Sequence, residues 1–128
     1  MPDVIDIDKQ IKRLLKSLFK DEDLNGAFDS YDEIVNVYGV DDRTILLRLK
    51  RIIISAPTTT TKKGKVRVGM PDLTKARILF ELGDTDRWIA EGGNPDLQMR
   101  RLISRLYMIG GIIKKDKQAF AKAKGIAI

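Results

Sequence analysis

The stretch "YDEIVNVYGVDDRTILLRLKR", residues 31–51, has the pattern of two short helices joined at a glycine, the second of them rich in arginine. Its apolar residues recur at helical spacing on both sides of Gly39, which indicates two amphipathic helices joined by a tight turn. Ser30 offers an N-cap for the first helix, with Glu33 three residues later to complete a capping box. The helix should end near Gly39, where a positive φ suits glycine.

The second helix should begin at about Arg43, because Asp41 or Asp42 can cap its first turn. We expect Val40 to be buried between Ile34 and Ile45. The apolar face of this helix carries Ile45, Leu46, Leu49 and Ile52. Its other face carries Arg43, Leu47, Arg48, Lys50 and Arg51, a set that arginine dominates. That face is the first candidate for contact with a partner.

The phrase "EIVNVYGVDDRTILLRLKR" resembles the helix-turn-helix DNA-binding superfamily, in which an E-I-A helix meets Y-G-V, two turn residues and R-T-I/V-x-x-R-L. Val35 departs from that pattern where a small residue is usual. The resemblance implies that the second helix crosses the first nearly at right angles and enters the major groove of DNA. The residues expected to face the groove are Arg43, Thr44, Leu47, Arg48 and Arg51. An ordinary helical hairpin is the alternative.

The segment "APTTTTKKGKVRVG", residues 56–69, follows directly. Two extended runs around a glycine-containing tip predict a β-hairpin, because proline, the threonine run and Gly64 oppose a helix. After a helix-turn-helix, such a hairpin has the position of a wing that lies along phosphates. Its cationic candidates are Lys62, Lys63, Lys65 and Arg67. A disordered loop (57–65) and an assembly arm against a neighbouring subunit are the alternatives.

The remaining segments predict helices. Residues 7–20 form an amphipathic first helix. After Pro71, Asp72 should cap a helix that ends at Gly83, and Asp84 should cap a further short helical turn.

Asn94 as N-cap and Pro95 at the first position give a strong start signal for a last helix, which Gly110 and Gly111 should break or kink. Its apolar face, within residues 97–109, can cover the core or join a homo-oligomer. The basic run at 114–124 is interpreted as a solvated helix face, with added nonspecific DNA affinity as the alternative.

Composition narrows the class of protein. The 128 residues carry a formal net charge of +6, which favours a polyanionic partner if the charge is clustered. The chain has no cysteine and no histidine, so the commonest metal ligands and general base are absent. We therefore expect no enzyme, no catalytic residue, no metal site and no cofactor. No apolar run is long enough for a membrane span, and a cytoplasmic protein without membrane contact is expected.

Together these patterns predict a mainly α protein. Residues 1–70 should form a helix-turn-helix domain with a basic wing, and residues 71–128 a helical C-terminal region for packing or oligomerisation. The predicted function is recognition of duplex DNA by a small regulator, a partition or replication accessory, or a phage DNA-packaging subunit. The alternative is a non-enzymatic structural or assembly protein of a virion or larger complex, which binds protein partners through its helices and threonine-rich loop.

Overall fold

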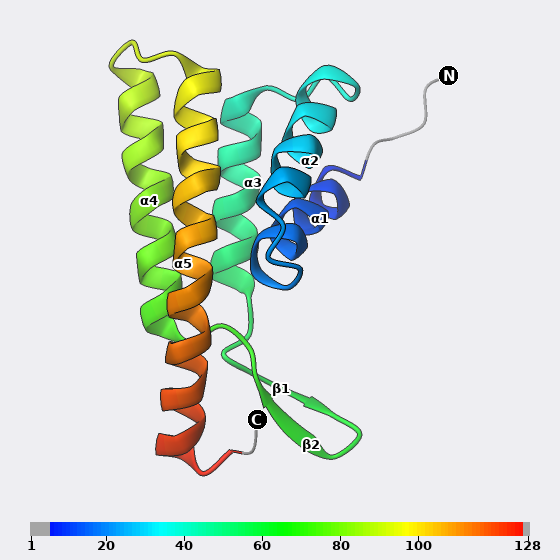
Figure 1. The fold of residues 1–128 in the computed structure, drawn as a ribbon, viewed down its shortest axis with the longest axis vertical. Helices are drawn as coiled ribbons and strands as arrows, with labels where there is room; N and C mark the ends of the chain where they lie inside the picture. The colour runs from blue at the N-terminus through cyan, green and yellow to red at the C-terminus, as the bar shows by residue number, and fades with distance from the viewer. Residues whose placement is uncertain (1–5, 127–128) are drawn as a thin grey trace.

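The computed structural model describes residues 6–126 and is mainly helical, as predicted (Figure 1). The elements in chain order are α1 (Ile7–Phe19), α2 (Leu24–Asn36), α3 (Asp42–Ser55), β1 (Thr59–Lys62), β2 (Lys65–Val68), α4 (Asp72–Ala90) and α5 (Pro95–Lys124). Within the described part of the chain, no helix is long and apolar enough to span a bilayer.

One hydrophobic core holds all five of these helices together, and α5 contacts each of the other four. Its side chains include Leu14 and Leu18 of α1, Ile34 of α2, and Ile45 and Leu49 of α3. The apolar face predicted within residues 97–109 contributes Met99, Leu102, Ile103, Leu106 and Ile109. These five residues are therefore occupied by the packing of the chain's own core.

The turn between α2 and α3 has the predicted geometry. Gly39 has a φ of 68°, and the Val40 N–H donates a hydrogen bond of 3.1 Å to the carbonyl oxygen of Ile34. Val40 is buried with the core, and Asp41 caps α3 by accepting a 2.7 Å hydrogen bond from the Thr44 N–H. The sequence signals for this turn are confirmed.

The start of α2 differs from the prediction. Asp23, not Ser30, is the N-cap, and its carboxylate accepts a 2.9 Å hydrogen bond from the Gly26 N–H. Ala27, in the first turns of α2, is fully buried. Because the buried face begins there, the helix starts earlier than the capping box at Ser30 predicted, and Ser30 lies inside it.

The two helices around Gly39 run in opposite directions in Figure 1, with α2 rising toward the turn and α3 descending from it. They do not pack along each other. α2 packs on α1 and α5, whereas α3 packs on α1 and α4. The helix proposed to enter DNA is thus held within a five-helix bundle.

α4 is one continuous helix, so the predicted end at Gly83 is wrong. Buried Thr74, Ile78, Leu82 and Thr85 continue one face through the glycine. The burial of that face outweighs the roughly 1 kcal/mol that glycine costs inside a helix.

Of the other helix boundaries predicted within residues 71–128, one is confirmed and the rest are wrong. Pro71, not Asp72, holds the N-cap position of α4 and makes no side-chain cap bond. Asp84 lies inside α4 and bonds Arg87 instead of capping a new turn. Asn94 does cap α5, as predicted, and α5 runs unbroken through the glycine pair at 110–111.

The predicted β-hairpin is present. β1 pairs with β2 in antiparallel register, with Lys62 opposite Lys65 at the tip. Lys63 and Gly64 form the two-residue loop and both have positive φ, of 53° and 77°. Two positive φ values are typical of the type I′ turn, whose twist matches that of the paired strands.

Candidate functional site

The exposed face of α3 carries most of the predicted groove residues. Arg43, Leu47 and Arg51 point to solvent, whereas Thr44 is half-buried beside its capping aspartate. Hydrogen bonds from Thr44 lower the pKa of Asp41. Arg48 lies 3.6 Å from a carboxylate oxygen of Asp8 on α1. The arginine is thus partly neutralised by the bundle itself.

The predicted hairpin residues lie together on a projecting element. Lys62, Lys63, Lys65 and Arg67 are all exposed, and Figure 1 shows the hairpin extending away from the helices at one end of the molecule. The last turns of α5 extend at the same end. An open cleft between them is lined by Lys65, Val66, Arg67, Val68, Lys117, Gly125 and Ile126.

Five lysines lie on the last turns of α5, and one of them, Lys117, lines this cleft. They were not among the predicted site residues, because a basic run on a helix usually marks a solvated face. Lys114, Lys115, Lys122 and Lys124 are exposed, and Lys117 is half-buried in the cleft. The adjacent Asp116 accepts a 2.9 Å hydrogen bond from Thr74 and a 2.5 Å hydrogen bond from Arg77. The carboxylate within this run of lysines is therefore engaged with α4.

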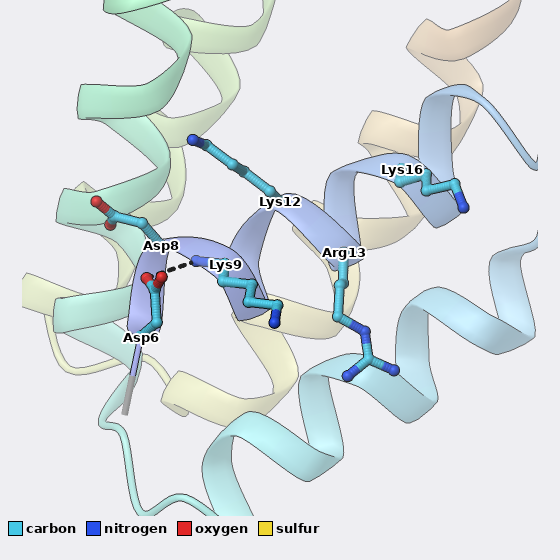
Figure 2. Close-up of a pocket in the computed structure, with 6 residues that line it drawn as sticks. All are labelled: Asp6, Asp8, Lys9, Lys12, Arg13 and Lys16. Carbon is cyan, nitrogen blue, oxygen red and sulfur yellow. Dashed lines mark hydrogen bonds between the residues drawn. The ribbon is translucent and has the colours of Figure 1, made fainter. Parts of the chain in front are cut away.

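A second cationic surface lies on α1 and is shown in Figure 2. Its residues are Asp6, Asp8, Lys9, Lys12, Arg13 and Lys16, around a shallow depression. Asp6 caps α1 by accepting a 3.0 Å hydrogen bond from the Lys9 N–H, drawn as a dashed line. The side chains in Figure 2 diverge instead of converging on one point, and acids stand among the bases.

Apolar side chains gather on the outer face of α4 and α5. A groove there is lined by Ala76, Arg77, Phe80, Glu81, Ile109 and Ile112. Leu73 lies seven residues before Phe80, and Met108 lies four before Ile112, so each pair shares a helix face. The exposed fractions are 57% for Leu73, 70% for Phe80, 73% for Met108 and 40% for Ile112. We call these four residues the α4–α5 apolar surface.

Ion pairs hold α4 and α5 in register beneath this surface. Arg77 pairs with Asp116, and Arg105 lies 3.3 Å from Glu81. Because both pairs link the two helices, they fix the relative position of the exposed apolar side chains. The two helices that carry the α4–α5 apolar surface are therefore linked by two ion pairs.

A polar cluster fixes α2, α3 and α5 at the other end of the bundle. The hydroxyl of buried Tyr31 donates a 2.7 Å hydrogen bond to Asp42 and lies 3.2 Å from Asp96. Burial, with these carboxylates, raises the pKa of the tyrosine hydroxyl well above its usual range. Arg100 completes the cluster by bonding Asp96 at 3.0 Å and Asp32 at 2.5 Å.

Comparison with known proteins identifies the family. No curated protein and no solved structure matches this chain. The model of one protein family, described as the replication factor C C-terminal domain, matches residues 7–105, which include α1 to α4, the hairpin and the first turns of α5. It is not a helix-turn-helix family, so the resemblance of residues 31–51 to that superfamily is confined to the motif. Because the match covers well over half of the sequence, the chain belongs to the replication factor C C-terminal domain family.

Proposed function

We propose that this chain is a non-enzymatic assembly domain of a DNA-replication complex. The α4–α5 apolar surface carries the proposal, because large apolar side chains gathered on one face of a helical bundle typically mark a protein interface. Membership of the replication factor C C-terminal domain family supports a role in replication. The two ion pairs between α4 and α5 hold the apolar surface in one arrangement, so it is formed before a partner binds.

The occupant that we propose for this surface is a second copy of the chain. The residues of 97–109 that face inward are used by the core, so self-association has to use the outer face of α5. Arg77 and Glu81 also line the groove, and both are already paired within the chain, with Asp116 and Arg105. A two-fold axis brings the same apolar patch of two copies together, as a self-complementary interface requires.

Phe80→Asp tests this proposal, because it places a charge in the centre of the apolar surface. Val37→Asp is the matched control, since Val37 is 71% exposed and follows α2, away from α4 and α5. Light scattering across protein concentration should show a dimer or larger assembly for the parent and for Val37→Asp, and a monomer for Phe80→Asp. A parent protein that stays monomeric at all concentrations overturns self-assembly through this face.

A second function, contact with duplex DNA, is favoured by the exposed cations of the hairpin. Four cationic residues on a projecting element suit phosphate oxygens. A protein that engages about five phosphates should lose affinity with salt at a log–log slope near −4 to −5. A flat salt dependence, or no binding at low salt, contradicts this function.

Arg43 and Arg51 on α3 are the proposed base-reading residues within that second function. Both are exposed, and arginine can make bidentate contacts to guanine. Arg43→Ala should then reduce discrimination between duplex sequences, whereas Lys62→Ala with Lys63→Ala should weaken all sequences about equally. Competition between duplexes of different sequence measures the difference, and unchanged discrimination in Arg43→Ala removes α3 from the reading role.

A further inference from the structure

The charge of this chain is concentrated at one end. Residues 59–69 and 114–124 together carry nine lysines and arginines and one aspartate, a net charge of +8. The whole chain carries +6, so all other residues together carry −2. We call the nine cations the basic end: Lys62, Lys63, Lys65, Arg67, Lys114, Lys115, Lys117, Lys122 and Lys124. The net charge of the protein is therefore a property of this end alone.

The two segments meet in space although they are about fifty residues apart in sequence. β2 contacts α5, and the cleft between them brings Lys65 and Arg67 to the same cavity as Lys117. Figure 1 shows the hairpin and the last turns of α5 at the same end of the molecule, beyond the rest of the bundle. Acids neutralise little of this charge. Asp116 bonds α4, and of the nine cations of the basic end, all of which the structure describes, only Lys114 is paired with an acid, Glu22.

Stability does not explain this arrangement. Nearly every hairpin residue is exposed, so the hairpin buries little apolar surface, and Lys62 lies opposite Lys65 as a like-charged pair. Lys122 and Lys124 do complement the carboxyl end of the α5 dipole. The helix dipole and the Lys114 pair give three of the nine cations a stabilising interaction. The other six are surrounded by like charges.

The other cationic surfaces lack this excess. Residues 6–23, which include α1, carry five bases and five acids. On α3, Arg48 is paired with Asp8, and Asp41 and Asp42 stand at the start of the helix. The basic end also lies partly outside the family match, since its α5 lysines follow residue 105. Family membership alone therefore does not account for it.

The chemistry of the basic end fits a phosphate backbone. Lysines and threonine hydroxyls along β1 suit phosphate oxygens, which carry no base sequence. The two segments contain one aromatic residue, Phe120, and Lys124 lies 6.0 Å from the centre of its ring. Single-strand sites usually stack bases on several aromatic rings. A duplex backbone is therefore favoured over unstacked bases.

We propose that the basic end binds the phosphate backbone of duplex DNA in its cleft, with the hairpin on one side and the last turns of α5 on the other. This inference rests on the proposed DNA contact and names the surface that makes it. The contacts that the basic end makes to phosphate are independent of base sequence, and α5 takes part in them, whereas base reading stays with the arginines of α3.

Four triple variants test the inference, each of which removes three positive charges. The hairpin variant is Lys62→Ala, Lys65→Ala and Arg67→Ala, and the α5 variant is Lys117→Ala, Lys122→Ala and Lys124→Ala. The matched control is Lys9→Ala, Lys12→Ala and Lys16→Ala on α1. The fourth variant, Arg43→Ala, Lys50→Ala and Arg51→Ala on α3, removes the proposed base-reading arginines. Anisotropy of a labelled duplex is titrated across salt concentrations, with circular dichroism to confirm folding of each variant.

The hairpin and α5 variants should each reduce the magnitude of the salt slope by about 2 to 3 and weaken binding at least about tenfold, because each phosphate that a cation neutralises adds roughly 0.9 to the slope. The α1 variant should keep the slope of the parent. If the α3 or α1 variant lowers the slope while the basic-end variants do not, this inference is overturned and the DNA function stands. If the parent does not bind the duplex at low salt, both fall. Poly-glutamate that binds the parent where the duplex does not would instead assign the basic end to an acidic protein.

Discussion

At the scale of single residues, Tyr31 joins three helices through one hydroxyl. The hydroxyl lies between Asp42 on α3 and Asp96 on α5, while the ring is buried from α2. Periodicity places Tyr31 on a helix, but its partners are 11 and 65 residues away. Periodicity reports which face a residue occupies and does not report which distant polar group meets it.

Tyr31→Phe should lower the free energy of unfolding by about 1–3 kcal/mol, because the carboxylate of Asp42 loses its donor. The substitution should also reduce the loss of folding stability at alkaline pH. Because the pKa is raised in the folded state, first by burial and then by Asp42, the hydroxyl loses its proton more readily in the unfolded chain. Its contribution is complete below pH about 10 and falls as the pH rises further.

Urea unfolding at pH about 8 and about 11, below and above the usual tyrosine pKa, measures this difference. The parent should lose more stability between the two values than Tyr31→Phe does. The two proteins differ only in the Tyr31 hydroxyl, so the difference between their losses is assigned to that group. An equal loss in both would show that the Tyr31 proton is not held by the fold.

At the scale of elements, the turn at Gly39 was predictable and the length of α4 was not. Gly39 needs a positive φ, and a local signal of glycine after an amphipathic helix is enough to find it. Gly83 gives the same local signal inside α4. There the continued burial of Leu82 and Thr85 decides the outcome, and burial depends on neighbours that the segment does not contain.

Replacing Gly83 and Gly39 with alanine should change the free energy of unfolding in opposite directions. Gly83→Ala should raise the free energy of unfolding by about 0.5–1 kcal/mol, because an added Cβ meets no atom within 4 Å and helix propensity improves. Gly39→Ala should lower it by about 1–2 kcal/mol, because a φ of 68° strains alanine although space is free. Denaturant unfolding compares them, and a stabilising Gly39→Ala would contradict the turn geometry.

At the scale of the whole molecule, four of the nine cations of the basic end were predicted from the sequence as site residues. Lys62, Lys63, Lys65 and Arg67 stand on a predicted hairpin, but the α5 lysines join them only because α5 stays unbroken through its glycine pair. The same continuity carries Ile112 to the groove beside Phe80. Both surfaces therefore depend on helix lengths that local signals mispredicted.

Like charges within the basic end repel each other and should lower the stability of the free protein at low salt. Moderate salt should therefore raise its stability. Raising sodium chloride from about 20 mM to about 200 mM screens the like charges and should raise the melting temperature by a few degrees. The hairpin triple variant should show a smaller rise, since three of the repelling charges are gone. Differential scanning calorimetry measures both proteins, and an equal rise in both would remove the basic end as the source.

In the proposed function, the domain assembles through the apolar surface of α4 and α5 and contacts DNA through the basic end. Native mass spectrometry with a short duplex counts chains and duplexes in one complex. The parent should give two or more chains on one duplex, Phe80→Asp one chain on one duplex, and the hairpin triple variant assemblies without duplex. Two chains on the duplex in Phe80→Asp, or no assembly in any spectrum, would contradict the account.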